Sequence, residues 1–154
     1  ALAVFASHDL PTLWGWWEGR DIELRQRLNL VPEADAARLR SERADDRARL
    51  VKACRDAGFL EDAAEHDFTS LQRAVHAFLA STNSALSIAQ LDDLTGEVDP
   101  VNIPATTNEY PNWRRRFSVD LDTLASDPAF DRILRSLDDA RRAEPGSNEG
   151  ADDE

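Results

Sequence analysis

Residues 1–17, ALAVFASHDLPTLWGWW, begin with a short apolar run and pass directly into a polar loop and an aromatic segment. The apolar run over residues 1–7 is typical of a strand in a parallel sheet that is covered on both faces. Residues 8–10 follow as a loop, and a helix is expected from Pro11, with Asp9 or Thr12 available as its N-cap. A strand, a polar loop and a helix in this order indicate an α/β fold.

The rest of the chain is predicted to be mostly helical, with few short strands. Helical spacing and capping residues predict four further helices. They cover residues 21–30, residues 32–57 ended by Gly58, a segment capped by Asp67 and broken at residues 82–84, and a last helix opened by Asp127 and Pro128. On the helix over residues 32–57, the side chains expected to face the core are Ala37, Leu39, Ala44, Ala48, Val51 and Ala53, and Asp45 and Arg49 are expected to pair on its outer face.

Between these helices the sequence predicts one more strand and a long irregular segment. The strand is expected at residues 85–90, a short helix or turn at residues 91–96, and irregular structure over residues 97–118, which contain Pro100, Pro104 and Pro111. The tail over residues 144–154 is acidic and is expected to be disordered. Two short strands cannot complete a parallel sheet, and the chain does not begin with Met, so we expect it to be a fragment.

The charge of the chain excludes several classes of function. Its 154 residues include 30 acids against 18 bases, for a formal net charge of −12. A nucleic-acid binder needs a clustered basic surface, and an anionic membrane surface attracts lysine and arginine side chains. Neither nucleic acid nor a membrane is therefore expected as a partner of this acidic chain. The single cysteine, Cys54, cannot form an internal disulfide and is expected to be packed, and a cytoplasmic location is the default.

His8 and Asp9 are the first candidates for chemistry, because catalytic residues of parallel α/β folds lie at the carboxyl ends of strands. The alternative is that Asp9 only caps the following helix. Trp14, Trp16 and Trp17 are expected to pack that helix rather than to bind ligand.

The second unusual segment, NIPATTNEYPNWRRRF over residues 102–117, is expected to be an ordered and functional loop. Its arginines at positions 114–116 are expected to pair with local acids rather than to bind phosphate. His66 and His76 lack the spacing of metal ligands, so we expect no metal, and the chain has no glycine-rich phosphate loop for a cofactor.

Two stretches carry a resemblance to a known family. SHDLPTLWGWWEGRDIELR and VNIPATTNEYPNWRRRFSVDL resemble, in the same order, two segments of the 4-alpha-glucanotransferases of the amylomaltase type, glycoside hydrolase family 77. The intervening TNSALSIAQLDDLTGEVDPVNIP also follows the family pattern, so the resemblance covers about residues 1–143. It implies that residues 1–143 are the C-terminal part of a (β/α)8 barrel of the TIM type.

The resemblance also implies an activity and roles for three residues. The family transfers segments of alpha-1,4-glucans between maltodextrins by a retaining double displacement, without a cofactor. Asp9 matches the carboxylate that stabilises the transition state, and His8 and Asn102 match residues that bind the sugar. The nucleophile and the acid/base of the family precede the matched segment, so this chain alone is expected to be inactive.

Two positions depart from the family pattern. Ser7 stands where the family has Thr, and Ala105 stands where it has Gly, so Ala105 is strained if its φ is positive. Two other functions remain open at this point: a non-catalytic helical interaction domain, and a hydrolase of the alpha-amylase clan.

Overall fold

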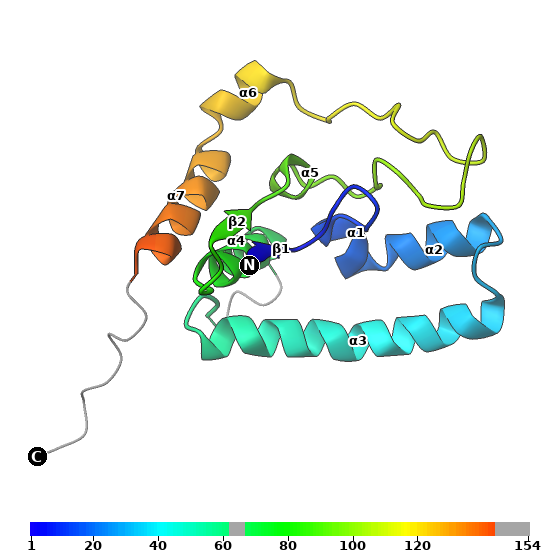
Figure 1. Ribbon diagram of the computed structural model, residues 1–154, viewed down its shortest axis with the longest axis horizontal. Helices are drawn as coiled ribbons and strands as arrows, with labels where there is room; N and C mark the ends of the chain where they lie inside the picture. The colour runs from blue at the N-terminus through cyan, green and yellow to red at the C-terminus, as the bar shows by residue number, and fades with distance from the viewer. Residues whose placement is uncertain (62–66, 144–154) are drawn as a thin grey trace, which may run out of the picture.

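The computed structural model describes residues 1–61 and 67–143. Its elements in chain order are β1 (Leu2–Val4), α1 (Leu13–Glu18), α2 (Arg20–Arg27), α3 (Glu33–Asp56), α4 (Phe68–Ala80), β2 (Leu86–Ile88), α5 (Leu91–Leu94), α6 (Leu121–Ser126) and α7 (Pro128–Arg142) (Figure 1). The predicted mostly helical chain with few short strands is confirmed. The predicted disordered tail, residues 144–154, lies outside the described residues, as does His66.

The two strands form a parallel pair, with Leu2 opposite Leu86 and Val4 opposite Ile88. Both lie within the predicted ranges but are shorter. Side chains alternate between the two faces of a strand, so Ala3, which is buried, faces away from these four residues. Leu2, Leu86 and Ile88 are 52%, 63% and 48% exposed. The expected burial of both sheet faces is therefore not met within the described residues.

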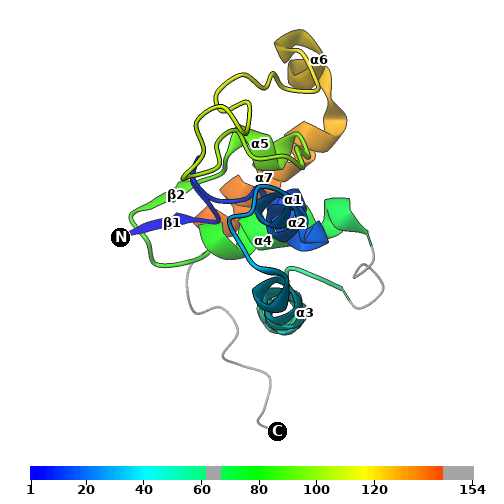
Figure 2. The same cartoon turned by 90° about the vertical axis from the view of Figure 1, so that its right-hand side faces the viewer.

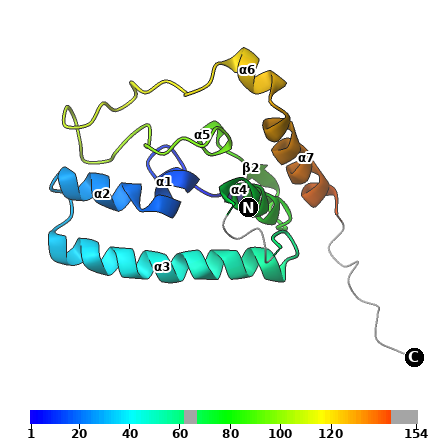
Figure 3. The same cartoon turned by 180° about the vertical axis from the view of Figure 1, so that it is seen from behind.

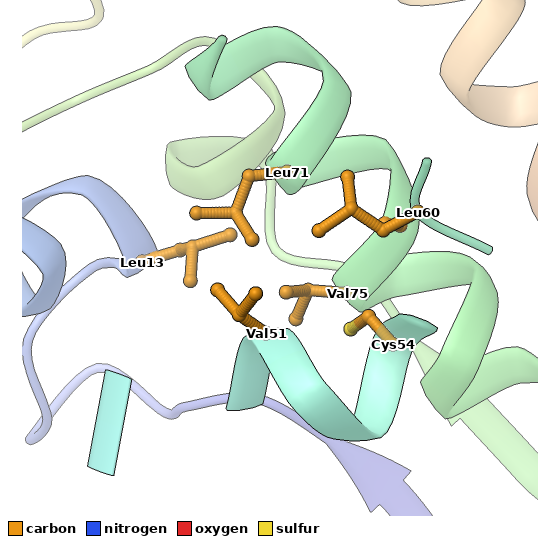
Figure 4. Packing of buried hydrophobic residues seen from close by; sticks show 7 residues of the cluster. Leu13, Val51, Cys54, Leu60, Leu71 and Val75 are labelled. Carbon is orange, nitrogen blue, oxygen red and sulfur yellow. The ribbon is translucent and has the colours of Figure 1, made fainter. Parts of the chain in front are cut away.

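Helix α4 is the centre of the molecule, and it packs against α3, α7 and both strands (Figures 1 and 2). It begins where predicted, because the carboxylate of Asp67 accepts hydrogen bonds from the backbone N–H groups of Thr69 and Ser70 at 3.3 and 3.1 Å. Apolar side chains from α1, α3 and α4 and from the segment after α3 meet here. They are Leu13, Val51, Cys54, Leu60, Leu71, Ala74 and Val75 (Figure 4).

The long helix α3 forms close to where the sequence predicts it, and Gly58 follows with a left-handed φ of 76°. Its predicted apolar face is wrong in part: Val51 is buried as expected, and Leu39 and Ala53 are half-buried. Ala37, Ala44 and Ala48 are exposed, and the buried positions are Ala36, Val51 and Cys54. The physical reason is that the middle of α3 contacts α1 and α2 through long arginine side chains rather than through alanines.

Two arginines of α3 make this contact. The guanidinium of Arg43 donates two hydrogen bonds of 2.8 Å to Asp21 and lies 4.8 Å from the ring of Trp16, and Arg47 lies 4.3 Å from the ring of Trp17. On the exposed side of α3, Arg49 pairs with Asp46 at 2.5 Å and not with Asp45 as predicted.

The C-terminal region contains one predicted helix and one unpredicted helix. Asp127 caps α7 as expected by accepting from the N–H of Ala129 at 2.8 Å, and Ile133 and Ala140 are buried on α7. The six-residue α6 before it is capped by Asp120, and its only buried residue is Leu124, so it has little amphipathic pattern to detect.

The segment between α5 and α6 is irregular, as predicted, and runs along α1 and α2 on the side opposite α3 (Figures 1 and 3). This arrangement brings residues 97–113 over the loop that follows β1. Among the described helices, none has both the length and the apolarity needed to cross a membrane.

Candidate functional site

The site is built on the loop between β1 and α1, which carries His8 and Asp9. Of the two expected caps, Thr12 is the one that caps α1: its Oγ1 accepts from the N–H of Gly15 at 3.0 Å. The same hydroxyl donates to the carbonyl oxygen of Val98 at 3.1 Å. The carboxylate of Asp9 is therefore not used as the helix cap.

Gly15 explains how closely the later segment approaches α1. A Cβ at this position would collide with the carbonyl oxygen of Val98. Without that Cβ, Thr12 reaches Val98, and residues 98–102 are held against the start of α1. This contact fixes the spacing between the two motifs that the sequence singles out.

The three predicted site residues lie together. The amide Nδ2 of Asn102 donates to Oδ1 of Asp9 at 2.7 Å, across 93 residues of sequence. Nε2 of His8 lies 3.3 Å from Oδ2 of Asp9. The side chains of His8 and Asp9 are 59% and 52% exposed, so an outside molecule can reach both. The arrangement offers a carboxylate, an imidazole and an amide on one accessible surface.

Hydrogen bonds within residues 100–113 hold Asn102 in position. Oδ1 of Asn112 accepts from the N–H of Ile103 at 2.9 Å, and its Nδ2 donates to Oγ1 of Thr106 at 2.7 Å. The hydroxyl of Tyr110 donates to the carbonyl oxygen of Pro100 at 2.6 Å. The segment is therefore an ordered loop, as predicted, because its own side chains satisfy its backbone.

Ala105 lies in this loop with a φ of 68°. This φ is positive, so the condition for strain at Ala105 is met, and its Cβ makes that conformation unfavourable by about 1–2 kcal/mol. Trp113 has a φ of 61° and Asn29, which follows α2, a φ of 56°.

A cavity of about 170 Å³ adjoins Asp9 and Asn102. Asp21 and Arg25 of α2 line its side, and the remaining wall is Leu10, Pro11, Pro100, Ile103 and Pro104. A concave, mostly apolar wall with a few polar groups is typical of small-molecule sites.

Of the arginines at positions 114–116, Arg115 pairs with acids as predicted. Arg115 forms a short ion pair with Asp92 and lies 3.1 Å from Oε2 of Glu97. Burial lowers the pKa of the Arg115 guanidinium. Because this guanidinium is engaged with two acids, it links the loop to α5.

The three tryptophans of α1 pack as expected, since all are half-buried. The ring of Trp14 lies edge-on to Phe68 with a centroid separation of 3.6 Å, and that of Trp16 lies edge-on to Phe5 at 5.8 Å. Cys54 is also packed, and burial raises the pKa of its thiol to about 11, so it is unreactive at neutral pH.

A buried pair under the loop is not predicted by the sequence. Asp93 and His76 are each 1% exposed, with Nε2 of His76 3.9 Å from Oδ2 of Asp93. Burial raises the pKa of Asp93 to about 6 and lowers the pKa of His76 to about 4. The segment LDDLTG around Asp93 reads as a short solvent-facing helix or turn, so no local pattern marks this carboxylate as buried.

Comparison with known proteins identifies a family for this chain. The sequence model of the family described as 4-alpha-glucanotransferase, glycoside hydrolase family 77, matches residues 1–122. This chain belongs to that family. Neither a non-catalytic interaction domain nor an alpha-amylase-clan hydrolase is favoured by these matches.

Individual relatives give the same result. The 4-alpha-glucanotransferase of Haemophilus influenzae is 29% identical over 147 residues, 92% of this chain and 21% of the relative. That of Mycobacterium bovis is 39% identical over 113 residues, 73% of this chain and 16% of the relative. The crystal structure of amylomaltase from Corynebacterium glutamicum superimposes with a TM-score of 0.79 at 30% identity, covering 89% of this chain and 21% of that one. The chain thus spans about a fifth of the length of the proteins it matches.

Proposed function

We propose that this chain forms part of the active site of a 4-alpha-glucanotransferase, which transfers alpha-1,4-glucan segments between maltodextrins with retention at the anomeric carbon. In this proposal residues 1–143 are the C-terminal part of the catalytic barrel. The nucleophile and the acid/base are supplied by other segments of a longer protein, and the chain alone is inactive.

The exposed sheet face supports the barrel. Leu2, Val4, Leu86 and Ile88 share one face of the parallel pair, and three of them are about half or more exposed. A barrel buries the inward face of each strand against the others, so an apolar face of this kind fits strands that lie beside further strands. The position of His8 and Asp9 directly after β1 fits the carboxyl end of such a barrel, where its active site lies.

The hydrogen bond from Asn102 to Asp9 carries the proposal. A retaining displacement passes through a transition state with positive charge at the anomeric carbon. Asn102 holds one oxygen of the Asp9 carboxylate and so orients this group toward the position of that transition state. His8 lies on the other oxygen and, as an exposed imidazole, binds a sugar hydroxyl.

A carboxylate that is fixed before the reaction favours the transition state over the ground state. Its attraction for the sugar grows as the ring acquires charge, and it does not have to reorient at that moment. Asp9 need not transfer a proton or form a bond. Its role in this proposal is electrostatic, and no cofactor or metal takes part.

Maltodextrin is the partner that this proposal requires, and neither nucleic acid nor a membrane is involved. The side chains of Asp9 and Asn102 supply hydrogen-bonding groups, and the prolines of the adjoining cavity supply flat apolar surface. A sugar is complementary to this surface, because its hydroxyls hydrogen-bond to polar side chains and its C–H faces pack on apolar ones. A cytoplasmic location completes the proposal, because the lone buried thiol of Cys54 suits a reducing compartment.

The product pattern of the longer protein tests this proposal. Incubation with maltotriose should yield glucose together with maltodextrins longer than the substrate, and Asp9→Asn should abolish most of both. Asp45→Asn, at an exposed position of α3, is the matched control and should leave the pattern unchanged. Products no longer than the substrate would indicate hydrolysis and contradict transfer.

A further inference from the structure

Trp113 is an exposed aromatic residue at the edge of the candidate site. Of the four tryptophans of the chain, the three of α1 are half-buried, whereas Trp113 is 62% exposed. The centroid of its indole ring lies 5.3 Å from that of the His8 imidazole, with the ring planes inclined at 47°. The exposed indole, with an imidazole beside it, offers an aromatic face on which a ligand ring can pack.

The loop holds this residue in an unfavourable backbone conformation. Trp113 has a φ of 61°, which is costly for a bulky side chain. Its N–H donates to the carbonyl oxygen of Val101 at 2.9 Å, directly beside Asn102. The preceding residue, Asn112, is fixed by its hydrogen bonds to Ile103 and Thr106. Several contacts therefore maintain a strained residue whose side chain adds little to the core.

The polar neighbours of Trp113 belong to the candidate site. His8 contacts the indole, and His8 and Asn102 both contact Asp9. A ring that lies against the indole would therefore also meet an imidazole and a carboxylate. This combination suits a pyranose, whose C–H face packs on an aromatic ring while its equatorial hydroxyls accept and donate hydrogen bonds at its rim.

We propose that the indole of Trp113 is a stacking platform for one glucosyl ring of the alpha-1,4-glucan, adjacent to the ring that His8 and Asp9 contact. This inference rests on the proposed function and adds a binding residue to it. Trp113 is a binding residue and takes no part in bond breaking. Its truncation therefore weakens glucan binding more than it slows the bound complex.

Kinetics of the longer protein with maltoheptaose provide the first test. Trp113→Ala should raise KM about tenfold, the scale of loss when an anchoring tryptophan is truncated. The kcat should change less than twofold. Trp113→Phe keeps an aromatic face and should recover most of the affinity. The matched control is Phe117→Ala, which removes a second exposed aromatic of the same loop, 42% exposed and lying near Arg115. Its KM should stay within twofold of wild type.

A second test needs no variant and so does not depend on folding of the substituted loop. Oxidation of tryptophan by N-bromosuccinimide is followed in the wild-type protein by mass spectrometry of the peptide that contains Trp113. Saturating maltoheptaose should slow this oxidation at least fivefold, whereas sorbitol at the same concentration should not.

The outcomes separate this inference from the proposed function. An unchanged KM in Trp113→Ala, or an oxidation rate of Trp113 in the wild-type protein that maltoheptaose does not slow, overturns the platform, even when Asp9→Asn removes transfer. If Trp113 resists oxidation in the absence of glucan, another protein segment covers its indole. That result also overturns the proposal that Trp113 is a stacking platform. Absence of transfer by the wild-type protein overturns the proposed function itself.

Discussion

The backbone N–H of Leu13 donates a 2.6 Å hydrogen bond to Oδ1 of Asp93, 80 residues later and inside the core. The carboxylate thereby holds the first turn of α1, directly after the His8–Asp9 loop. The side chain of Gln72 in α4 also donates to the backbone carbonyl of Asp93. A buried acid thus joins α1, α4 and α5 below the candidate site.

The Asp93–His76 pair predicts two opposite pH dependences of stability. Asp93 has a folded-state pKa of about 6, above its ordinary value. Its contribution to the free energy of unfolding is therefore present at low pH and is lost as pH rises through 6. His76 has a folded-state pKa of about 4, below its ordinary value, so its contribution is present above pH 6.5 and is lost as pH falls toward 4. The two effects oppose each other between pH 4 and 6.

Replacing one residue of the pair should reveal the pH dependence of stability that the other residue causes. In His76→Leu, the free energy of unfolding should fall as pH rises from 4 to 6. In Asp93→Asn, it should fall as pH drops from 6.5 to 4. Each full unit of pKa shift corresponds to about 1.4 kcal/mol. Urea unfolding across this range measures both slopes at concentrations where the chain is monomeric. Parallel slopes in the two variants would contradict the assignment.

Ala105→Gly should stabilise the protein. The left-handed φ of 68° costs a residue with a Cβ about 1–2 kcal/mol, which exceeds the entropic cost of a new glycine of about 0.4–1 kcal/mol. We expect a gain of several tenths of a kcal/mol in thermal or urea unfolding. Ala44→Gly on the exposed face of α3 is the control with the opposite sign, with an expected loss of about 1 kcal/mol. A loss in both variants would show that Ala105 is not strained.

Asn102→Ala should lower the kcat of the longer protein by about 10- to 100-fold, the range for a hydrogen bond to a charged group. Asn102→Asp should lower it further, because a second carboxylate then faces Asp9. Asn83→Ala, in the exposed turn after α4, serves as the control. Turnover of Asn102→Ala equal to that of the control would mean that the hydrogen bond between Asn102 and Asp9 has no part in catalysis.

The open sheet face should make the 154-residue chain associate when it is produced alone. Leu86 and Ile88 are exposed on it, and exposed apolar sheet faces and edges recruit other chains. Leu86→Lys with Ile88→Lys should shift the chain toward monomer in analytical ultracentrifugation. Leu121→Lys on α6, at a position 73% exposed but away from the sheet, should have no effect. A wild-type chain that stays monomeric at all concentrations would show that this face needs no cover.

The sequence predicts the elements whose signals are local. Asp67 and Asp127 mark helix starts by side-chain capping, and Gly58 marks a helix end. The packing of α3 is not predictable in this way, because part of it is made by Arg43 and Arg47, which a search for apolar residues passes over. The guanidinium groups of these arginines lie over the rings of Trp16 and Trp17, a contact that leaves no apolar signal in the sequence of the helix.

The site is predicted only in part for a similar reason. His8, Asp9 and Asn102 stand out through family resemblance, whereas nothing in one motif shows that it lies against the other. The contact depends on Gly15, which admits the Val98 carbonyl, and on Asp93, which anchors α1. Both act through pairing between distant segments, so neither has a signal within its own stretch of sequence.

The role of the Asp9 charge is tested most sharply by measuring turnover and binding separately in Asp9→Asn of the longer protein. If the charge of Asp9 acts on the transition state, kcat should fall about 10²–10³-fold, while the Kd for maltodextrin changes only a few-fold. Equal thermal stability of the two proteins is checked first. A near-wild-type kcat in Asp9→Asn would contradict the claim and leave the contacts of Asp9 with His8 and Asn102 as a structural feature of the loop.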